Sequence, residues 1–442
     1  MKKTSFKAGI AASLVAFMSL ASLNAADTAL STAYEMALEN DELVKSTMYE
    51  DMAAKERTWQ ATAALLPSIE AVYVYNGEKY DKKIDGTKLG RTNETFQRYG
   101  VTLTQQLIRP DLWYGRAQEG LRESGYDIIY EQAKQELANR VATAYFELAY
   151  ANKNLELAGF LENANRAKFE QLSKQLELGL ANKMDTLEAN VRYDQALLGV
   201  SRAERRIEVA KLALAKIVGQ EIEVAYDFEN IKLDFFDTVD VTKYENVFAN
   251  HEYQQSEIAS KIATHEKNKR IAAFFPTADL SLSFSNYDYK DKVRFGDEKN
   301  KVEAMVRVSM PIFKSGFNYA RLQEGEYLKM SSLSKQLDTQ RKVQVEQKTA
   351  VSDFRNFLSE AKIMQDSVKT AELYLLAVER GYSEGLRDIV ELFDARARVH
   401  QTMLDALEAA HKLVLSYIKL ESLVGSISPE TIQNLQGVFA SK

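Results

Sequence analysis

Cysteine is absent from the chain, and only five prolines occur among its 442 residues. Without cysteine there is no disulfide bond and no lipid-bearing cysteine of the kind that anchors a lipoprotein. Stability must therefore come from packing and oligomerisation. The scarcity of proline leaves long stretches free to form helix, because proline interrupts helices.

Motifs that carry chemistry are also scarce. The four histidines form no metal-site pattern, because neither His251-Glu252 nor His265-Glu266 is followed by the second histidine of a zinc-binding helix. The sequence has no glycine-rich phosphate loop and no G-x-S-x-G nucleophile motif. We therefore expect a protein that is not an enzyme and that holds no cofactor or metal.

A long uncharged stretch occurs only near the N-terminus. Three lysines precede the uncharged residues 8–26, which end in small residues, a pattern typical of a secretory signal peptide. A signal anchor is the alternative, but the serine- and alanine-rich composition favours cleavage after Ala25 or Ala26. Removal of residues 1–25 leaves 54 basic and 63 acidic residues, a net charge of −9, which disfavours nucleic acid as a partner. Later uncharged stretches are too short for a membrane-spanning helix.

The chain carries one pattern twice. Pro67 and Pro110 bracket a short segment, and Pro276 and Pro311 bracket a second one about two hundred residues later. Val101, Thr104, Tyr114, Arg116, Gln118, Glu119 and Gly120 reappear as Val306, Ser309, Tyr319, Arg321, Gln323, Glu324 and Gly325, and Gly179 and Gly219 reappear as Gly385 and Gly425. A nearly constant offset, 205 and then 206 residues, indicates one supersecondary unit used in tandem.

Each repeat contains a long proline-free segment, over residues 112–178 and 317–384. Apolar residues recur there at helical spacing, as at Leu137, Val141 and Leu148. A continuous helix of about 65 residues would be about 100 Å long, more than a compact domain needs. Dense alanine is typical of closely packed helices, so a plain periplasmic coiled coil also fits the helices alone.

The proline-bracketed segments show the other periodicity. Leu280, Leu282 and Phe284 alternate with Ser281 and Ser283, which predicts a strand with one apolar and one polar face. We expect two such strands in each repeat, each about 10 residues long, the length that crosses an outer membrane when tilted.

Polar loops are expected to join the strands over residues 77–94 and 290–301. Aromatic residues gather near the strand ends, as an interfacial girdle requires. Four strands cannot close a barrel, and an open sheet edge in lipid leaves backbone groups without partners. Three copies would supply twelve strands, so closure predicts a homotrimer.

Several segments carry a specific resemblance to the TolC-like outer-membrane efflux family. They are Leu65-Leu66-Pro67, Thr143-Ala144-Tyr145-Phe146, the run over residues 381–395, and Leu423-Val424-Gly425. The resemblance implies a mostly α fold with a membrane β-barrel, in which a trimeric 12-stranded β-barrel continues into a 12-helix periplasmic α-barrel. It also implies the outer membrane of a Gram-negative bacterium, and an exit duct for efflux of small molecules or type I protein secretion.

The resemblance further implies partners and an organisation along the chain. The partners are a periplasmic adaptor, an inner-membrane pump of the RND, ABC or MFS type, and outer-membrane lipid. The expected segments are a signal peptide (1–25), a first repeat (26–219, strands about 68–107 and helices about 112–219), an inter-repeat equatorial segment (220–250), a second repeat (251–425, strands about 277–311 and helices about 317–425), and a C-terminal equatorial segment (426–442). A periplasmic coiled-coil or adaptor protein bridging two membranes is the alternative function.

The resemblance also places a periplasmic entrance. Glu391 and Asp394 would face the lumen, so that three chains form rings of carboxylates that favour cations. By their spacing alone, two acids three residues apart on a helix equally fit a solvated face.

A latch between helices is implied beside the acid rings, with Arg387 directed toward Asp185 and with Tyr382 nearby. Arg387 alone equally fits a solvated helix residue. The turns at Gly179 and Leu180, and at Gly385 and Leu386, would be the tips at which the adaptor docks, although glycine there is also explained as a helix cap.

Overall fold

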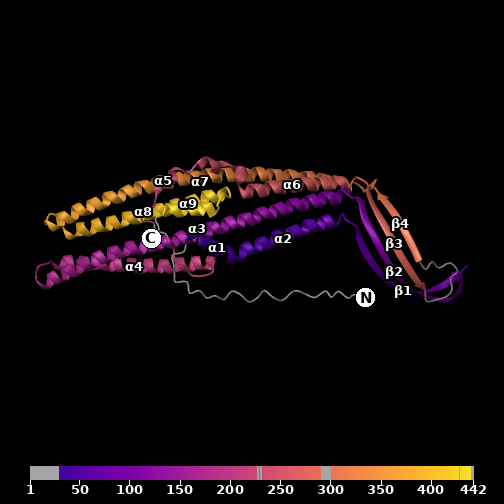
Figure 1. Ribbon diagram of the computed structural model, residues 1–442, viewed down its shortest axis with the longest axis horizontal. Helices are drawn as coiled ribbons and strands as arrows, with labels where there is room; N and C mark the ends of the chain where they lie inside the picture. The colour runs from indigo at the N-terminus through magenta and orange to yellow at the C-terminus, as the bar shows by residue number, and fades with distance from the viewer. Residues whose placement is uncertain (1–28, 226–227, 229–230, 290–299, 428, 440–442) are drawn as a thin grey trace, which may run out of the picture.

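The computed structural model describes residues 29–225, 228, 231–289, 300–427 and 429–439 (Figure 1). The expected signal peptide lies outside the described residues, as does most of the expected loop over residues 290–301. The chain is elongated, with a bundle of helices along most of its length and a sheet at one end (Figure 1).

Apart from α1, the two halves of the chain contain the same order of elements. The first half consists of α1 (Leu30–Asn40), α2 (Glu42–Ala63), β1 (Ser68–Ile84), β2 (Thr87–Ile108), α3 (Pro110–Glu177) and α4 (Lys183–Val218). The second consists of α6 (His251–Ala272), β3 (Thr277–Tyr289), β4 (Asn300–Ser309), α7 (Phe317–Ser383) and α8 (Ile389–Leu423). Between them lie α5 (Leu233–Asp237), η1 (Val241–Glu245) and η2 (Val247–Ala249), and α9 (Pro429–Val438) follows.

Each strand is continued by a helix. Contacts place α2, α3, α6 and α7 side by side in that order, and they adjoin β1, β2, β3 and β4 in the same order at one end of the sheet (Figure 1). Farther from the sheet α2 and α6 are replaced by α4 and α8, which pack against α3 and α7. The 68 residues of α3 span about 100 Å at the helical rise. None of the described helices has both the length and the apolar composition needed to cross a membrane.

The register of the antiparallel sheet separates apolar from polar side chains. One row across the strands consists of Ala71, Val101, Phe284 and Val302. The neighbouring row, one residue away along each strand, lies on the opposite face and contains Glu70, Thr102 and Ser283. Directly opposed residues share a face, so one face of the sheet is apolar across all four strands and the other is largely polar.

The prediction of a loop over residues 77–94 is wrong, because both strands continue through these residues. β1 runs to Ile84 and β2 begins at Thr87, with Asp85 and Gly86 as the turn. Both turn residues have positive φ, 49° and 82°, as a tight two-residue hairpin turn requires. Asp-Gly supplies this conformation locally, so the hairpin does not depend on apolar alternation in its outer part.

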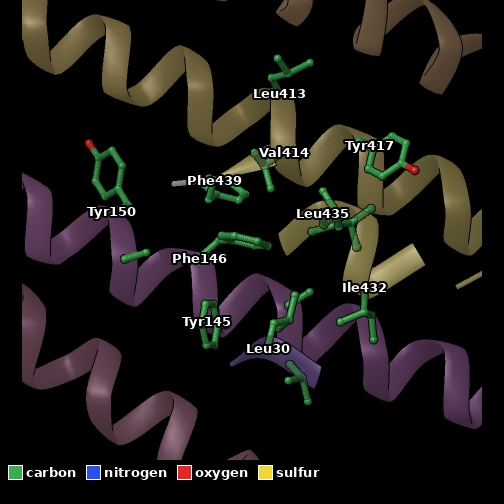
Figure 2. Packing of buried hydrophobic residues seen from close by; sticks show 14 of the residues in the cluster. Leu30, Tyr145, Phe146, Tyr150, Leu413, Val414, Tyr417, Ile432, Leu435 and Phe439 are labelled. Atoms are coloured by element: carbon green, nitrogen blue, oxygen red, sulfur yellow. The ribbon is translucent and has the colours of Figure 1, made fainter. Parts of the chain in front are cut away.

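The main hydrophobic core lies in the middle of the helical region. There α3 and α8 enclose the inter-repeat and C-terminal segments (Figure 2). Phe146 stacks on Phe439 with ring centroids 5.0 Å apart, and the Tyr145 hydroxyl accepts a 2.8 Å hydrogen bond from the backbone N–H of Ala225. The segments over 220–250 and 426–442 therefore wrap the helices through contacts of their described residues.

A buried carboxylate ties the same region together. Glu421 is only 2% exposed and accepts hydrogen bonds from the hydroxyls of Tyr244 and Ser426. Lys243 Nζ lies 2.9 Å from the same carboxylate. Because a buried charge is costly without partners, this cluster fixes η1 and the end of α8 to each other.

Candidate functional site

The helices α3 and α4 form one helical hairpin, and α7 and α8 form a second. The two helical hairpins end in matching turns at the tip of the molecule. Gly179 and Gly385 have φ values of 73° and 75° just after α3 and α7. The N–H of Leu180 donates to the Gln175 carbonyl (2.7 Å), and that of Leu386 donates to the Gly381 carbonyl (2.8 Å). These bonds complete the glycine cap that satisfies the last carbonyls of a helix.

The tips present leucine to solvent. In the single chain Leu180 is 76% exposed and Leu386 is 74% exposed, and a Cβ added at either glycine would meet no atom within 4 Å. The glycines are thus required by backbone conformation and not by crowding. Exposed leucine on two equivalent turns is a surface suited to contact with another protein.

The acid residues expected at the entrance both lie in α8 and both have cationic partners. Arg387 Nη1 lies 3.1 and 3.2 Å from the two carboxylate oxygens of Glu391. Arg192 Nη2 of α4 donates to Asp394 Oδ1 at 3.1 Å. The expected latch and acid ring are therefore connected, because one arginine of the latch binds one acid of the ring.

The other expected latch residues, Asp185 and Tyr382, lie on α4 and α7. Asp185 is in the first turn of α4, and within the described part of the chain Arg387 forms its ion pair with Glu391 and not with Asp185. The ring of Tyr382 lies 4.3 Å from Lys168 Nζ, a cation–π contact. Asp388 accepts a 2.8 Å hydrogen bond from the backbone N–H of Glu391, so its side chain serves as the N-cap of α8.

Two cationic residues that the sequence did not single out join the hairpins. Arg192 connects α4 to α8 through Asp394. Arg396 of α8 donates to the Ala164 carbonyl of α3 (3.3 Å) and to Glu379 of α7 (3.2 Å). The spacing of Glu188 and Arg192 signals only the ion pair within α4, since contacts between hairpins depend on the packing of distant segments.

A small apolar cluster supports the tip beneath these polar contacts. Its buried members are Leu172, Ala189, Val378, Ile389, Leu392, Phe393 and Ala395, drawn from all four helices of the two hairpins. Leu392 and Phe393 of α8 are buried in this cluster. Glu391 and Asp394 are three residues apart and so share the other face of the helix, which points away from the cluster. Apolar packing and at least two arginines thus join the four helices to one another at the tip of a single chain.

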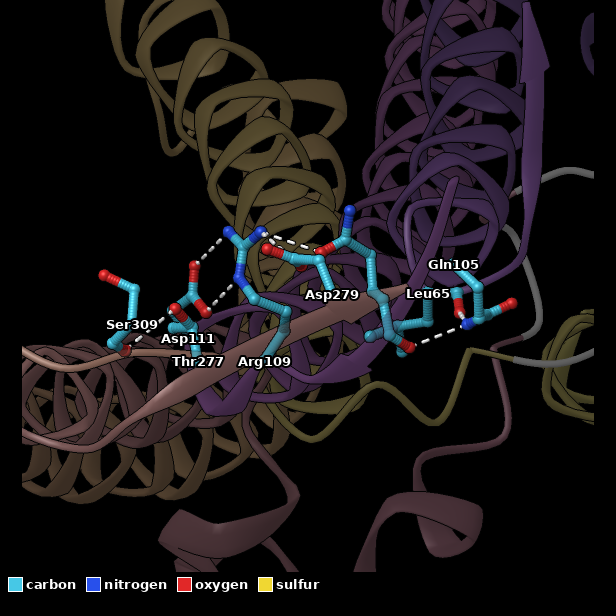
Figure 3. Close-up of polar contacts among 8 residues, drawn as sticks. Leu65, Gln105, Arg109, Asp111, Thr277, Asp279 and Ser309 are labelled. Atoms are coloured by element: carbon cyan, nitrogen blue, oxygen red, sulfur yellow. Dashed lines mark hydrogen bonds and ion pairs between the residues drawn. The ribbon is translucent and has the colours of Figure 1, made fainter. Parts of the chain in front are cut away.

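A second polar site lies where the sheet meets the helices (Figure 3). Arg109 binds Asp111 through two hydrogen bonds of 3.0 and 2.9 Å, donates to Gln106 at 2.9 Å and lies 3.9 Å from Asp279. The Arg109 hydrogen bonds hold the pKa of the Asp111 carboxyl below its usual value. Pro110 is the first residue of α3, where its missing N–H costs nothing. The Arg109 side chain therefore fixes the orientation of α3 relative to β2 and β3.

Among the described residues no group of three or more histidines and carboxylates is arranged to hold a metal ion. The polar features of the tip and of the joint are ion pairs and caps. They position helices and set local charge, and they offer no nucleophile with an activating base.

The sequence model of the outer membrane efflux protein family matches residues 33–220 and 249–426. The chain therefore belongs to this family and is an outer-membrane protein, which confirms the resemblance and the location expected from the sequence. The family forms channels and is not a known class of enzyme.

Similar proteins in this family include export components. The chain is 25% identical to the outer membrane protein TolC of Escherichia coli K12, over 95% of this chain and 86% of that protein. It is 25% identical to the proteases secretion protein PrtF of Dickeya chrysanthemi, over 97% and 95%. It is 22% identical to the alkaline protease secretion protein AprF of Pseudomonas aeruginosa, over 96% and 90%.

Solved structures show the same fold. The chain superimposes on CusC with a TM-score of 0.78 at 16% identity, covering 90% of this chain and 92% of that one. On the outer membrane protein VceC of Vibrio cholerae the TM-score is 0.77 at 15% identity, covering 90% and 96%. These similarities agree with a mostly helical chain that carries a small sheet.

Proposed function

We propose that this protein is an exit duct of the outer membrane, through which an inner-membrane transporter expels its cargo. The observation that carries the proposal is the sheet, which has an apolar face and a polar face and whose strands β2 and β4 continue into helices about 100 Å long, α3 and α7. An apolar face suits lipid, a polar face suits a water-filled lumen, and the helices have the length to cross much of a periplasm.

A trimer follows from the edges of the sheet. β1 and β4 form its two edges in the described chain, and lipid provides no partner for their backbone groups. Three copies would pair each β4 with the next β1 and close a barrel of twelve strands. Because four helices of each chain lie side by side at every level, the same symmetry would give a barrel of twelve helices.

The tip would be the regulated entrance of this duct. Glu391 and Asp394 would form the acid rings, and their charge would favour cations in a narrow neck. Arg387, together with Tyr382 and Asp185, would restrain the closed state. Since Arg387 binds Glu391 within one chain, opening would have to exchange this pair for another partner.

The exposed tips would receive a periplasmic adaptor. Leu180 and Leu386, beside Gly179 and Gly385, present apolar side chains on rigid turns, which suits a helical hairpin of the adaptor. The adaptor would connect the duct to a pump of the RND, ABC or MFS type. The relatives AprF and PrtF are protease secretion proteins, which supports type I secretion beside efflux of small molecules.

The alternative, a periplasmic coiled-coil adaptor, has less support. Such a protein would have no need for a sheet with an exposed apolar face, on which Ile69, Phe284 and Val306 are all at least 48% exposed. Family membership likewise favours a channel.

A genetic experiment tests the proposal. Deleting the gene should raise sensitivity to toxic compounds or block secretion of a protein, and restoring the wild-type gene should reverse the effect. Leu180→Asp with Leu386→Asp should insert normally but fail to restore export, because charge at the tips opposes apolar docking. The control Leu180→Met with Leu386→Met keeps the tips apolar and should restore it. Normal export in the deletion strain, with no second family member present, would refute the duct.

A further inference from the structure

A cavity of about 570 Å³ lies at the joint between the sheet and the helices. Its wall is formed by the last turns of α6, the ends of β3 and β4 and the first turns of α7, together with Asp111 of α3. Figure 3 shows Asp111, Thr277 and Ser309 of this wall. A volume of this size is typical of sites for small organic ligands.

The cavity lies on the polar side of the sheet. Thr277 and Ser309 are directly opposed and alternate with apolar Ala278 and Val308, so their side chains share the polar face. Arg109, which holds Asp111 in the wall, contacts Asp279 of the same face. If the protein is the proposed duct, this side is the lumen, and the inference below rests on that proposal.

The acids around the cavity are already neutralised by partners. Asp111 is bound by Arg109. Arg270 binds Glu266 through Nε at 3.1 Å and Glu324 through Nη1 at 2.7 Å. Arg270 is therefore committed to protein carboxylates, and Asp111 and Glu266 are each bound by an arginine, with Lys269 adding only a longer-range attraction to Glu266.

Three further cations line the same cavity. Lys269, Lys314 and Arg321 have no carboxylate within ion-pair distance in the part of the chain that the structure describes. The first turn of α7, beside Lys314, contains no acidic residue, so the positive end of the helix dipole adds to the same field. The cavity thus has an excess of positive charge.

We propose that this cavity is a lumenal binding site for small organic anions that carry carboxylate, sulfonate or phosphate groups. Lys269 and Lys314 supply point charges, and the planar guanidinium of Arg321 can bind such a group through two hydrogen bonds. With three copies in the proposed trimer, the site would lie in a ring below the membrane segment. Anionic cargo that has passed the helical region would be held there before it leaves.

Calorimetric titration can test this site directly. The probe is benzene-1,3,5-tricarboxylate, added to purified trimer in nanodiscs of phosphatidylcholine. The triple variant Lys269→Gln, Lys314→Gln and Arg321→Gln should bind the probe at least about tenfold more weakly, because three charge-assisted contacts are lost. The matched variant Lys335→Gln, Lys348→Gln and Arg355→Gln removes the same charge from exposed positions of α7 and should bind it within about twofold of wild type. If the triple variant fails to assemble, Lys314→Gln alone should still weaken binding.

Three results would overturn the inference. The first is no binding by wild type, and the second is equal weakening in the cavity variants and the control variant. The third is loss of probe binding when phosphatidylglycerol is included in the nanodisc, since the site would then belong to a lipid headgroup. Ion conductance of the wild type is measured in parallel. A conducting trimer that binds no probe contradicts only the anion site, whereas a protein that does not conduct contradicts the duct.

Discussion

Breaking the contact between Arg192 and Asp394 should shift the tip toward its open state. This ion pair joins α4 to α8, and its side chains are 30% and 60% exposed. An exposed pair of this kind contributes about 0.2 to 1 kcal/mol. Three pairs in the proposed trimer contribute about 0.6 to 3 kcal/mol, so their loss should raise the ratio of open to closed channels about 3-fold to 140-fold.

Single-channel recording in planar lipid bilayers measures this ratio. Arg192→Gln, Asp394→Asn and the double variant form a cycle that isolates the pair, since Arg192 also binds Glu188 at 2.7 Å within α4. Glu188→Gln is the matched control, because it removes a partner of Arg192 and leaves the contact between hairpins. The effect should shrink in high salt, where exposed charges are screened. Strictly additive effects of the two substitutions, or opening by Glu188→Gln to the same degree, would refute the reasoning.

Three other predictions concern the tip and the core. A Cβ at Gly381 would lie 2.8 Å from Arg387 Cγ, so Gly381→Ala should displace Arg387 from Glu391 and raise conductance, while Gly199→Ala, whose Cβ meets no atom within 4 Å, should not. Glu421→Gln should lower the free energy of unfolding by about 1 to 3 kcal/mol in denaturant titrations, because the hydroxyl of Tyr244 loses a charged acceptor; an unchanged midpoint would contradict this. Burial lowers the pKa of His411, although nearby Glu147 opposes the shift, so the unfolded chain binds a proton that the folded chain does not. Stability should therefore fall as the pH drops through about 6.5, and calorimetry should find a smaller fall in His411→Gln.

Local sequence signals predicted much of the fold. The alternation around Leu282 placed β3, and Pro110 and Gly179 mark the two ends of α3. Each of these signals acts over a few residues, through alternation of side chains, a missing N–H or a positive φ. Asp85-Gly86 is an equally local signal, and reading it as a hairpin turn would have predicted that β1 and β2 extend through the expected loop.

Contacts between distant segments could not be predicted in the same way. The resemblance directed Arg387 toward Asp185 and gave Glu391 another role, whereas the structure places Glu391 against Arg387. Arg192 and Asp394 are 202 residues apart, so their pairing depends on how the two hairpins pack. The cavity at the joint likewise combines α6, α7 and two strand ends, and only the fold shows which of its cations have no carboxylate within ion-pair distance among the described residues.

Cysteine crosslinking tests the central claim, that three copies close one channel, most directly. The chain contains no cysteine, so a cysteine introduced at Ile69 on β1 and another between Val302 and Val308 on β4 report contacts without background. Among a panel of such pairs, we expect at least one to form disulfides in outer-membrane preparations that give dimers and trimers and nothing larger. Single-cysteine controls should remain monomeric on denaturing gels. Monomers alone across the whole panel, or a ladder that continues beyond three chains, would contradict a closed trimer.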